Sequence, residues 1–277
     1  MRTDLHSHTT ASDGTLSPTA LVTMAQQRGI GVLAVTDHDT VAGHAEAIAA
    51  GEALGVRVLR GIEVSALSDE GKEVHVLGYG VQPSDDATRI KIESLRDVRE
   101  ARAKSLLSKL SALGIAINFE RVKAFAGDGM IGRPHVARAM VEAGVVRTVN
   151  QAFDEYLGEG KPGFVSHEGL TPQQALALIH RAHGAAVVAH PMLYKGNLEG
   201  LLQDVIAAGL DGIEAFYPAH TPEQTQHFVR LAEKQGLIVT GGSDFHGPLG
   251  DLEVSLGTIS LPEDAITKLD ARIQNYK

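Results

Sequence analysis

Histidine and carboxylate side chains recur in short motifs along the chain, and their types favour binding of metal ions. The segment RTDLHSHTTASDG (2–14) holds His6 and His8, separated by one residue, and Asp13 five residues after His8. Imidazole and carboxylate groups are common ligands of divalent cations. The sequence contains no Cys, so disulfides and thiolate ligands are excluded, and any metal must be held through nitrogen and oxygen.

The same residue types follow other apolar segments, mostly where a strand is expected to end. The further candidates are His38 in TDHD, Glu63 in GIEVS, His75 in EVHVLGYG, His190 in AHP, and Asp244 and His246 in GSDFH. In a barrel of parallel strands, active sites are built at the carboxyl-terminal ends of the strands. We therefore expect these side chains to meet at one site.

Apolar strands alternate with amphipathic helices over most of the chain, which predicts a parallel α/β fold. The expected strands are 4–8, 31–39, 56–66, 73–81, 185–191, 212–217 and 238–244, and the expected helices between them are 17–29, 40–54, 171–183, 197–208 and 221–235. Roughly 200 residues of this alternation favour a TIM-like barrel. Residues 84–166 show helical patterns only, at about 85–113, 134–144 and 147–157. We expect a barrel formed by 1–83 and 167–277, with 84–166 as a helical insertion that contacts substrate phosphate.

The composition is that of an ordinary globular protein, with 43% hydrophobic and 21% charged residues and a net charge of −9. This charge argues against binding of duplex DNA, which needs an extended basic face. It allows a small phosphorylated ligand in a locally basic pocket. No apolar segment is long enough to span a membrane, and the first residues do not resemble a secretory signal. We expect a cytoplasmic protein that does not bind membranes.

Each motif has a simpler interpretation when it is taken alone. An H-x-H pair is often part of a polar loop, TDHD can cap the helix that follows it, and GSDFH can form a turn. Glu63 is harder to explain in this way, because a carboxylate within an apolar strand needs a partner or a metal ion. The recurrence of these residues at successive strand ends favours a metal centre.

In this order along the chain, the motifs DLHSHTTASDG, TDHD, GIEVS, EVHVLGYG, AHP and GSDFH resemble the PHP (polymerase and histidinol phosphatase) family. The resemblance spans residues 4–247. It implies a distorted (β/α)7 barrel with a metal centre for phosphoester hydrolysis. Within the family, RDVREARAK and GRPHVAR resemble the branch that removes the 3′-phosphate from 3′,5′-bisphosphonucleotides, whose relatives degrade short RNA from the 5′ end.

The resemblance implies three divalent ions, with Mn²⁺ as the expected metal and Fe²⁺ or Zn²⁺ as alternatives. It assigns His6, His8, Glu63 and Asp244 to the first ion, Asp13, His38 and His246 to the second, and Glu63, His75 and His190 to the third. Other branches of the family often have His where this chain has Asp13. Asp4, Asp37 and Asp39 are expected to orient ligand imidazoles by hydrogen bonds.

The charge of such a centre favours phosphoester hydrolysis. Three divalent ions outweigh the three carboxylates among the expected ligands, so the site attracts an anionic phosphate. Hydroxide bound to the metal ions would attack phosphorus. The sequence suggests no protein nucleophile, since it has neither Cys nor a G-x-S-x-G motif.

Further residues are candidates for binding the phosphate that does not react. Arg99 and Arg102 lie three residues apart on the expected long helix and so project as neighbours. Arg133 stands at a helix start, where backbone amides also favour anions. Taken alone, RDVREARAK is typical of a solvated helix face, but the resemblance favours phosphate ligands. His135 either joins the arginines or is satisfied within its own helix start.

Other histidines and one tyrosine receive minor roles. His44, His180, His183 and His227 lie within or beside helical patterns and are assigned to packing or the surface. Tyr217, at a strand end, is a weak candidate for stacking on a base.

The main hypothesis is a metal-dependent phosphatase that converts nucleoside 3′,5′-bisphosphates to nucleoside 5′-monophosphates and phosphate. The alternative is a 5′→3′ exoribonuclease that acts on short RNA with the same centre. A histidinol-phosphate phosphatase leaves the insertion arginines unexplained. An amidohydrolase barrel also begins with H-x-H, but TDHD and Glu63 fit it poorly. A non-catalytic nucleotide-binding module is disfavoured because every expected ligand is present.

Overall fold

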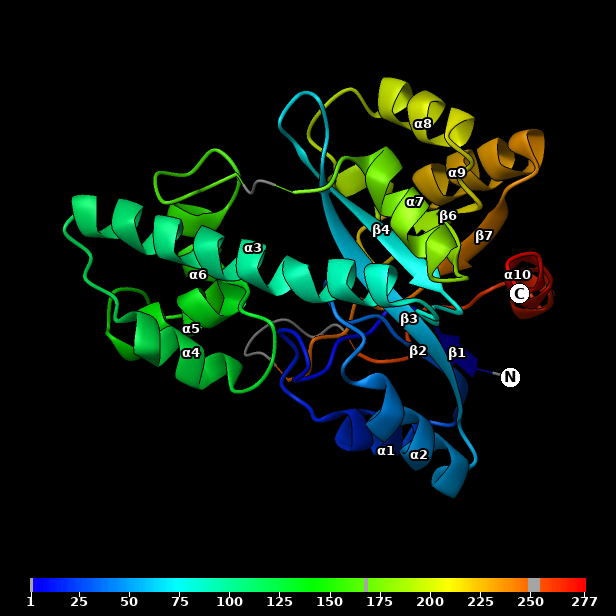
Figure 1. Cartoon of the computed structure of the whole chain (residues 1–277), viewed down its shortest axis with the longest axis horizontal. Coiled ribbons are helices and arrows are strands. Elements are labelled where there is room, and N and C mark those ends of the chain that lie inside the picture. The colour runs from blue at the N-terminus through cyan, green and yellow to red at the C-terminus, as the bar shows by residue number, and fades with distance from the viewer. Residues whose placement is uncertain (1, 167–168, 249–254) are drawn as a thin grey trace.

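The computed structural model describes residues 2–166, 169–248 and 255–277, and its centre is a seven-stranded barrel (Figure 1). The strands lie in the sheet in chain order. They are β1 (Arg2–Asp4), β2 (Ile30–Val35), β3 (Arg57–Leu67), β4 (Glu73–Tyr79), β5 (Ala185–Val188), β6 (Gly212–Phe216) and β7 (Ile238–Gly241). This is the expected distorted TIM-like barrel, although most strands are shorter than expected.

Backbone hydrogen bonds just beyond β1 and β7 close the barrel. The amide of His8 donates to the carbonyl of Phe245 over 2.9 Å, and the amide of Asp244 donates to the carbonyl of His6 over 2.9 Å. Gly242 permits this approach, because a Cβ there would lie 2.3 Å from the His6 nitrogen. The closure therefore brings the first and last candidate ligand segments side by side.

The strand β4 is antiparallel to both β3 and β5, whereas the other pairs are parallel. The parallel pairing expected from the alternation of strands and helices holds for the other pairs, and β4, which follows β3 with no helix between them, is the exception. Because β4 runs in the opposite direction, its first residues, among them His75, lie at the edge where the neighbouring strands end. Glu63 does not end its strand, since β3 leaves β2 after Arg60 and continues in its pairing with β4 to Leu67.

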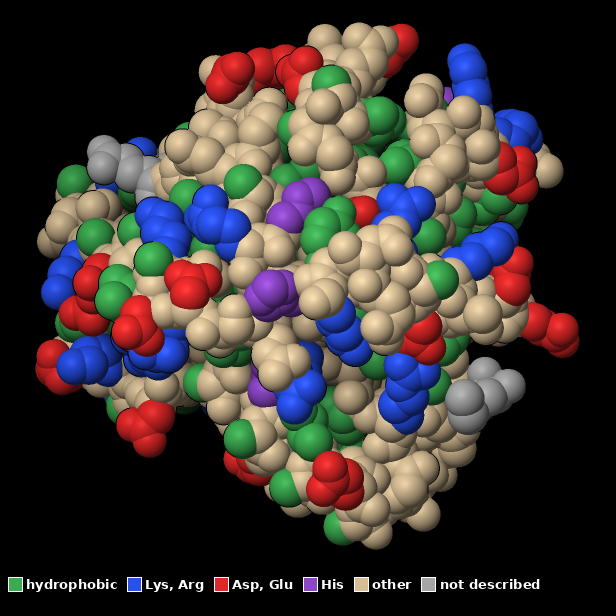
Figure 2. Space-filling view, turned by 45° about the vertical axis from the view of Figure 1, so that its right-hand side comes forward, with side chains coloured by type: hydrophobic (Ala, Val, Ile, Leu, Met, Phe, Trp, Pro, Cys, Tyr) green, Lys and Arg blue, Asp and Glu red, His purple; other side chains and the backbone are tan. Residues whose placement is uncertain are grey.

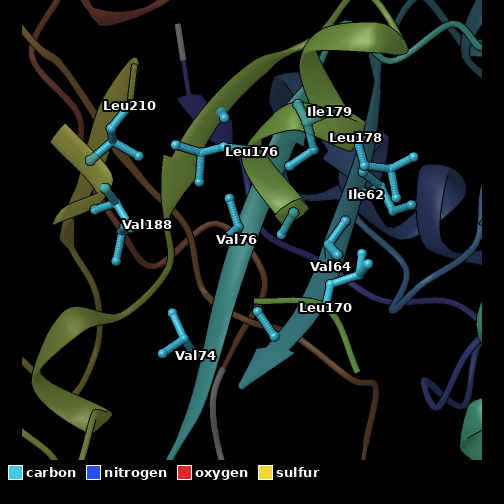
Figure 3. Close-up of a cluster of buried hydrophobic side chains, with 14 of the residues drawn as sticks. Ile62, Val64, Val74, Val76, Leu170, Leu176, Leu178, Ile179, Val188 and Leu210 are labelled. Carbon is cyan, nitrogen blue, oxygen red and sulfur yellow. The ribbon is translucent and has the colours of Figure 1, made fainter. Parts of the chain in front are cut away.

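Helices cover the outside of the barrel in two groups (Figure 1). The helices α1 (Pro18–Gln27) and α2 (His44–Leu54) pack beside β2, and the helices α7 (Pro172–Arg181), α8 (Leu198–Ala207) and α9 (Pro222–Gln235), with the short η2 (Pro191–Leu193), cover β4 to β6. Figure 3 shows how Val64 and Val76 from the sheet meet Leu176 and Ile179 from α7. Burial of these apolar surfaces holds the helices on the sheet.

The interior of the barrel is a separate apolar cluster. It includes Leu5, Val32, Leu77 and Val187 from the strand segments, all fully buried. The last helix, α10 (Ala265–Gln274), adds Leu269 to the same cluster. The interior is therefore filled by side chains, which leaves the strand ends as the place for polar chemistry.

The insertion lies to one side of the barrel and has its own hydrophobic core (Figure 1). Its elements are α3 (Asp86–Ala112), α4 (Phe119–Ala126), α5 (Arg133–Glu142), α6 (Val149–Ala152) and the π-helix η1 (Phe153–Leu157). Leu106 and Leu110 of α3 pack there against Val136 and Met140 of α5. The helix α4 was not expected from the sequence. The expected boundary between the insertion and the barrel, at residue 167, lies outside the described residues. Within the described ranges, no helix has the length and apolar character needed to cross a bilayer.

A buried carboxylate fastens α10 to the end of the barrel opposite the candidate ligands. Asp211 accepts hydrogen bonds from the backbone amide of Ala186 and from the Tyr276 hydroxyl, and it contacts His180 Nε2 at 2.9 Å and Arg272 at 3.1 Å. Burial alone would raise the pKa of the Asp211 carboxyl, but the hydrogen bonds from these partners outweigh it and lower the pKa. The ionised carboxylate therefore stabilises the folded state.

We expect Asp211→Asn to lower the free energy of unfolding by about 2 to 3 kcal/mol, because hydrogen bonds to a charged group are lost. The contribution of Asp211 to the free energy of unfolding should be complete above the pKa of Asp in the unfolded chain, about 4. It should be lost as the pH falls from that value through the lower pKa of the folded state. Denaturant unfolding of both proteins at several pH values measures this. A difference between the two proteins that does not shrink at acidic pH would contradict it.

Candidate metal centre

The nine expected ligands come together at the carboxyl-terminal edge of the barrel. Among the described residues, three groups of His, Asp and Glu offer ligand atoms that lie within 4.8 Å of one another. The groups are His6, His8, Glu63 and Asp244; His8, Asp13, His38 and His246; and His38, Glu63 and His75. The first group has the membership expected from the sequence, whereas the second also contains His8 and the third contains His38 in place of His190.

Glu63 lies at the centre of this cluster and is only 1% exposed. Its Oε2 lies 3.3 Å from His6 Nε2, 3.2 Å from His8 Nε2 and 3.1 Å from His38 Nδ1, and its Oε1 lies 2.8 Å from His75 Nδ1 and 3.1 Å from His190 Nε2. His190 therefore reaches the cluster through Glu63. One carboxylate thus touches five imidazoles, which come from the ends of three strands, β1, β2 and β5, and from the start of β4.

The imidazoles keep the carboxylates ionised. Burial alone would raise the pKa of the Glu63 carboxyl, but His38, His75 and His6 outweigh it and hold the pKa well below its usual range. In the same way, nearby imidazoles lower the pKa of the buried Asp13 carboxyl and of the half-buried Asp244 carboxyl. Carboxylates that are ionised and buried are ready ligands for a divalent cation.

The hydrogen-bonding state of the cluster fits bound metal ions. Six buried ligand atoms make no hydrogen bond of ordinary geometry within the described structure: His6 Nε2, His8 Nδ1, His8 Nε2, His38 Nδ1, Glu63 Oε2 and His75 Nδ1. Buried polar atoms without partners are rare, and one cause is an ion that binds them. The donor set of nitrogen and oxygen suits first-row divalent metals.

A cavity of about 590 Å³ opens onto the cluster. Its lining includes the ligand candidates Asp13, His38, His75, Asp244 and His246, and it also includes the three expected arginines Arg99, Arg102 and Arg133. The remaining wall is largely apolar and belongs to the insertion, with Leu106, Ile131, Val136, Val149 and Phe153, together with Asn150 and Asp154. The cavity is therefore lined by ligand candidates, by three arginines and by an apolar wall from the insertion.

The three arginines are held in place by carboxylates and carbonyls. Arg99 donates to Asp39 Oδ2 and, over 2.7 Å, to the Ser65 hydroxyl. Arg102 and Arg133 share the carboxylate of Glu73, and Arg102 also donates to the carbonyl of residue 165. Burial lowers the pKa of the Arg102 guanidinium to about 10, so it remains charged at neutral pH.

The described residues that line this cavity do not include His135. Its Nδ1 accepts a hydrogen bond from the backbone amide of Gly132 at the start of α5. Burial lowers the pKa of His135 to about 4, so the imidazole is neutral at pH 7. This geometry is that of a histidine satisfied within its own helix start, the second of the two roles expected for it.

The three aspartates expected to orient imidazoles have other hydrogen-bond partners. Asp4 accepts from backbone amides only, those of residues 6, 243 and 257. Asp37 accepts from Thr9 and Ser12, and Asp39 accepts from the Ser65 amide and from Arg99. In the described structure none of them hydrogen-bonds to an imidazole. Their side chains instead fix the loops that carry the ligand candidates.

Two residues of the β6 segment, Glu214 and Tyr217, contact the cluster, and neither contact was expected from the sequence. Glu214 is fully buried, and its Oε1 lies 3.0 Å from His6 Nδ1. The Tyr217 hydroxyl donates to Asp244 Oδ2 over 3.0 Å, a contact different from the expected stacking on a base. Glu214, like Glu63, is a carboxylate within an apolar strand. This pattern in the sequence is the signal that identifies Glu214 as a further functional residue.

The sequence matches the PHP domain over residues 4–158, more than half of its length. The chain belongs to the PHP domain family. The resemblance drawn from the motifs is thereby confirmed.

Relatives cover nearly all of this PHP-domain chain. A Haemophilus influenzae protein named 5′-3′ exoribonuclease is 40% identical over 256 residues, which are 91% of this chain and 92% of the relative. A Chromobacterium violaceum protein named 3′,5′-nucleoside bisphosphate phosphatase is 39% identical over 249 residues, 88% and 87% of the two chains. A solved Chromobacterium violaceum structure, described as an amidohydrolase with bound sulfate and no metal, superposes with a TM-score of 0.88 at 36% identity and covers 98% and 97% of the two chains.

Because Glu63 contacts ligand candidates of all three groups, its loss should weaken metal binding to this PHP domain most. We expect Mn²⁺ at about 100 times its dissociation constant to stabilise the native chain by about 2.7 kcal/mol per site, and a chelator to remove the effect. Glu63→Gln should lose most of the Mn²⁺ response in thermal unfolding and bind less Mn²⁺ by elemental analysis. Glu159→Gln, which removes a partner of Lys72 outside the cluster, is the control. An unchanged Mn²⁺ response in Glu63→Gln would contradict the assignment.

Proposed function

We propose that this PHP-domain protein is a metal-dependent phosphatase that hydrolyses the 3′-phosphate of nucleoside 3′,5′-bisphosphates. The products are nucleoside 5′-monophosphate and inorganic phosphate. The observation that carries the proposal is the single cavity lined both by the ligand cluster and by Arg99, Arg102 and Arg133. A substrate with two phosphates has one group for each of these two parts.

The proposed metal ligands are the nine residues that the sequence singled out. His6, His8, Glu63 and Asp244 would hold one divalent ion, Asp13, His38 and His246 a second, and Glu63, His75 and His190 a third, with Mn²⁺ as the expected metal. Such ions neutralise charge on a phosphate and activate water for attack on phosphorus. Glu63 would keep the set together, since its two oxygens face different imidazoles.

The arginines are proposed to bind the phosphate that does not react. Arg102 and Arg133 already converge on one carboxylate, that of Glu73, which shows that both guanidinium groups can face one anionic group. Guanidinium groups bind phosphate oxygens through paired hydrogen bonds. Arg99, fixed by Asp39 and Ser65, lines the same cavity as these arginines and the ligand cluster.

The apolar wall of the cavity is suited to the nucleoside. Phe153, Val149 and Ile131 line it, and a nucleobase buries its flat apolar faces against such side chains. Asn150 and Asp154 add polar groups that can hydrogen-bond to a base edge. A volume of about 590 Å³ is within the range of pockets for small organic ligands and is suited to one nucleotide.

The second candidate function, 5′→3′ exonuclease activity on short RNA, is favoured by the name of the Haemophilus influenzae relative. The charge distribution is compatible with it. Residues 84–166 hold 13 of the 25 Lys and Arg residues but only 11 of the 34 Asp and Glu residues. On the face seen in Figure 2, basic and acidic side chains are interspersed, so this face offers no broad basic surface to a duplex.

An amidohydrolase is less well supported, although one solved relative is described by that name. A neutral amide would make no use of the three half-buried guanidinium groups that line the cavity. The sulfate bound in that relative is itself a tetrahedral dianion like phosphate. Histidinol phosphate carries a single phosphate, so it would not use both parts of the cavity.

The Mn²⁺-loaded enzyme should hydrolyse adenosine 3′,5′-bisphosphate with a kcat/KM at least about 100-fold higher than adenosine 3′-monophosphate, because only the first has a phosphate for the arginines. Release of inorganic phosphate measures both rates. The same assay with a 5′-phosphorylated RNA dinucleotide, histidinol phosphate and an N-acyl amino acid ranks the alternatives. Equal kcat/KM values for the two adenosine compounds would contradict the assignment of a second phosphate site.

We expect Arg102→Met to lower kcat/KM for the bisphosphate by about 10-fold to 100-fold, since one charge-assisted contact is lost. For adenosine 3′-monophosphate the variant should equal the native enzyme. Arg96→Met is the matched control: Arg96 lies on the same helix and also donates to backbone carbonyls, but it is not part of the cavity lining. A parallel loss on both substrates in Arg102→Met would indicate a structural role.

A further inference from the structure

The strand β6 supplies none of the nine proposed ligands, yet its segment touches three of them. Glu214 contacts His6 and the backbone of His190, and Tyr217 contacts Asp244. We propose that Glu214 and Tyr217 are positioning residues that set the orientation of these ligands and thereby the affinity for metal. The inference rests on the proposed function, because it assumes the ligand roles given above.

Glu214 fixes the ring of His6 through the nitrogen that faces away from the cluster. Its Oε1 lies 3.0 Å from His6 Nδ1, while His6 Nε2 lies 3.3 Å from both Glu63 Oε2 and Asp244 Oδ1. A carboxylate only accepts, so a hydrogen bond here places a proton on Nδ1. The lone pair of Nε2 then faces the carboxylates with which it would share a metal ion.

The second oxygen of Glu214 holds the backbone of His190. Its Oε2 accepts from the His190 amide over 2.8 Å. His190 has a φ of 27°, and Asp244 has a φ of 56°, both in the left-handed region that residues other than glycine rarely adopt. Such backbone is kept only where the surrounding contacts determine it. Glu214 therefore holds a strained residue in the conformation that turns its imidazole toward Glu63.

Tyr217 contacts a further ligand candidate, Asp244. Its hydroxyl donates to Asp244 Oδ2, while Asp244 Oδ1 faces His8 Nε2 at 3.1 Å. The Tyr217 ring lies against the His190 ring with 5.3 Å between centroids. A carboxylate only accepts hydrogen bonds, so the Tyr217 hydroxyl is the donor in this contact.

Glu214→Gln keeps the volume of the side chain but replaces one acceptor with a donor. The amide cannot accept from both the His6 ring and the His190 amide, and an NH2 group facing His6 Nδ1 would move the ring proton to Nε2, where the metal must bind. We expect Mn²⁺ affinity, measured by competition with a chelator, to fall about 10-fold to 100-fold. Excess Mn²⁺ should restore most of the activity, because the proposed catalytic groups remain.

Asp211→Asn is the matched control for Glu214→Gln. Asp211 stands at the other end of the β6 segment and likewise receives an imidazole, that of His180, and a backbone amide, that of Ala186. The Asp211→Asn variant should unfold at a lower temperature than the native chain, but its affinity for Mn²⁺ should lie within about twofold of the native affinity. If Glu214→Gln binds Mn²⁺ like the native chain, or if Asp211→Asn loses as much affinity, the positioning role is refuted.

Tyr217→Phe tests the second contact and keeps the ring. We expect a loss of Mn²⁺ affinity of about threefold to tenfold, as for one lost hydrogen bond. Tyr194→Phe, which removes a hydroxyl that donates to Ser68, should leave the affinity unchanged. Equal affinities in the two variants would refute the role of Tyr217. Because these measurements contain no substrate, they distinguish a failure of this inference from a failure of the proposed reaction.

Discussion

The burial of the Glu63 carboxylate among five imidazoles is the interaction on which the site depends. A lone carboxylate in that position would be costly, because the surrounding barrel offers it little water. The imidazoles compensate this cost only when four separate segments of the chain deliver them to within about 3 Å of the carboxylate. The fold must therefore bring residues from both halves of the chain to one point, and a divalent cation at that point turns the accumulated polar groups into ligands.

Two features of the barrel meet this demand. Its closure places the His6 segment against the Asp244 segment, with Gly242 allowing the close approach. The reversal of β4 delivers His75 from the start of a strand to the edge where the other strands end. A wholly parallel barrel would need a longer connection before β4 to place a histidine there, whereas a hairpin with β3 does so directly.

The sequence predicted that the ligand candidates would meet, because each follows, or lies within, a recognisable apolar strand, and the strand-end rule needs no knowledge of side-chain contacts. It predicted the partners of those ligands poorly. Asp4, Asp37 and Asp39 are near ligands in the sequence, yet they bind backbone amides, hydroxyls and Arg99. Glu214 is distant in sequence from His6 and contacts it directly. Which acid meets which imidazole depends on the register and closure of the sheet, and local patterns do not contain that information.

The insertion resolves an apparent conflict between a net charge of −9 and an anionic substrate. Its near balance of basic and acidic residues leaves the acidity of the chain largely to the barrel. Its arginines enter the cavity from one side, while the ligand cluster enters from the barrel side. At an ionic strength of about 0.15 M, exposed charges beyond about 8 Å are screened, but groups inside a cavity are screened much less. Local placement therefore outweighs total charge, because the insertion places three guanidinium groups in the cavity that opens onto the candidate metal ligands.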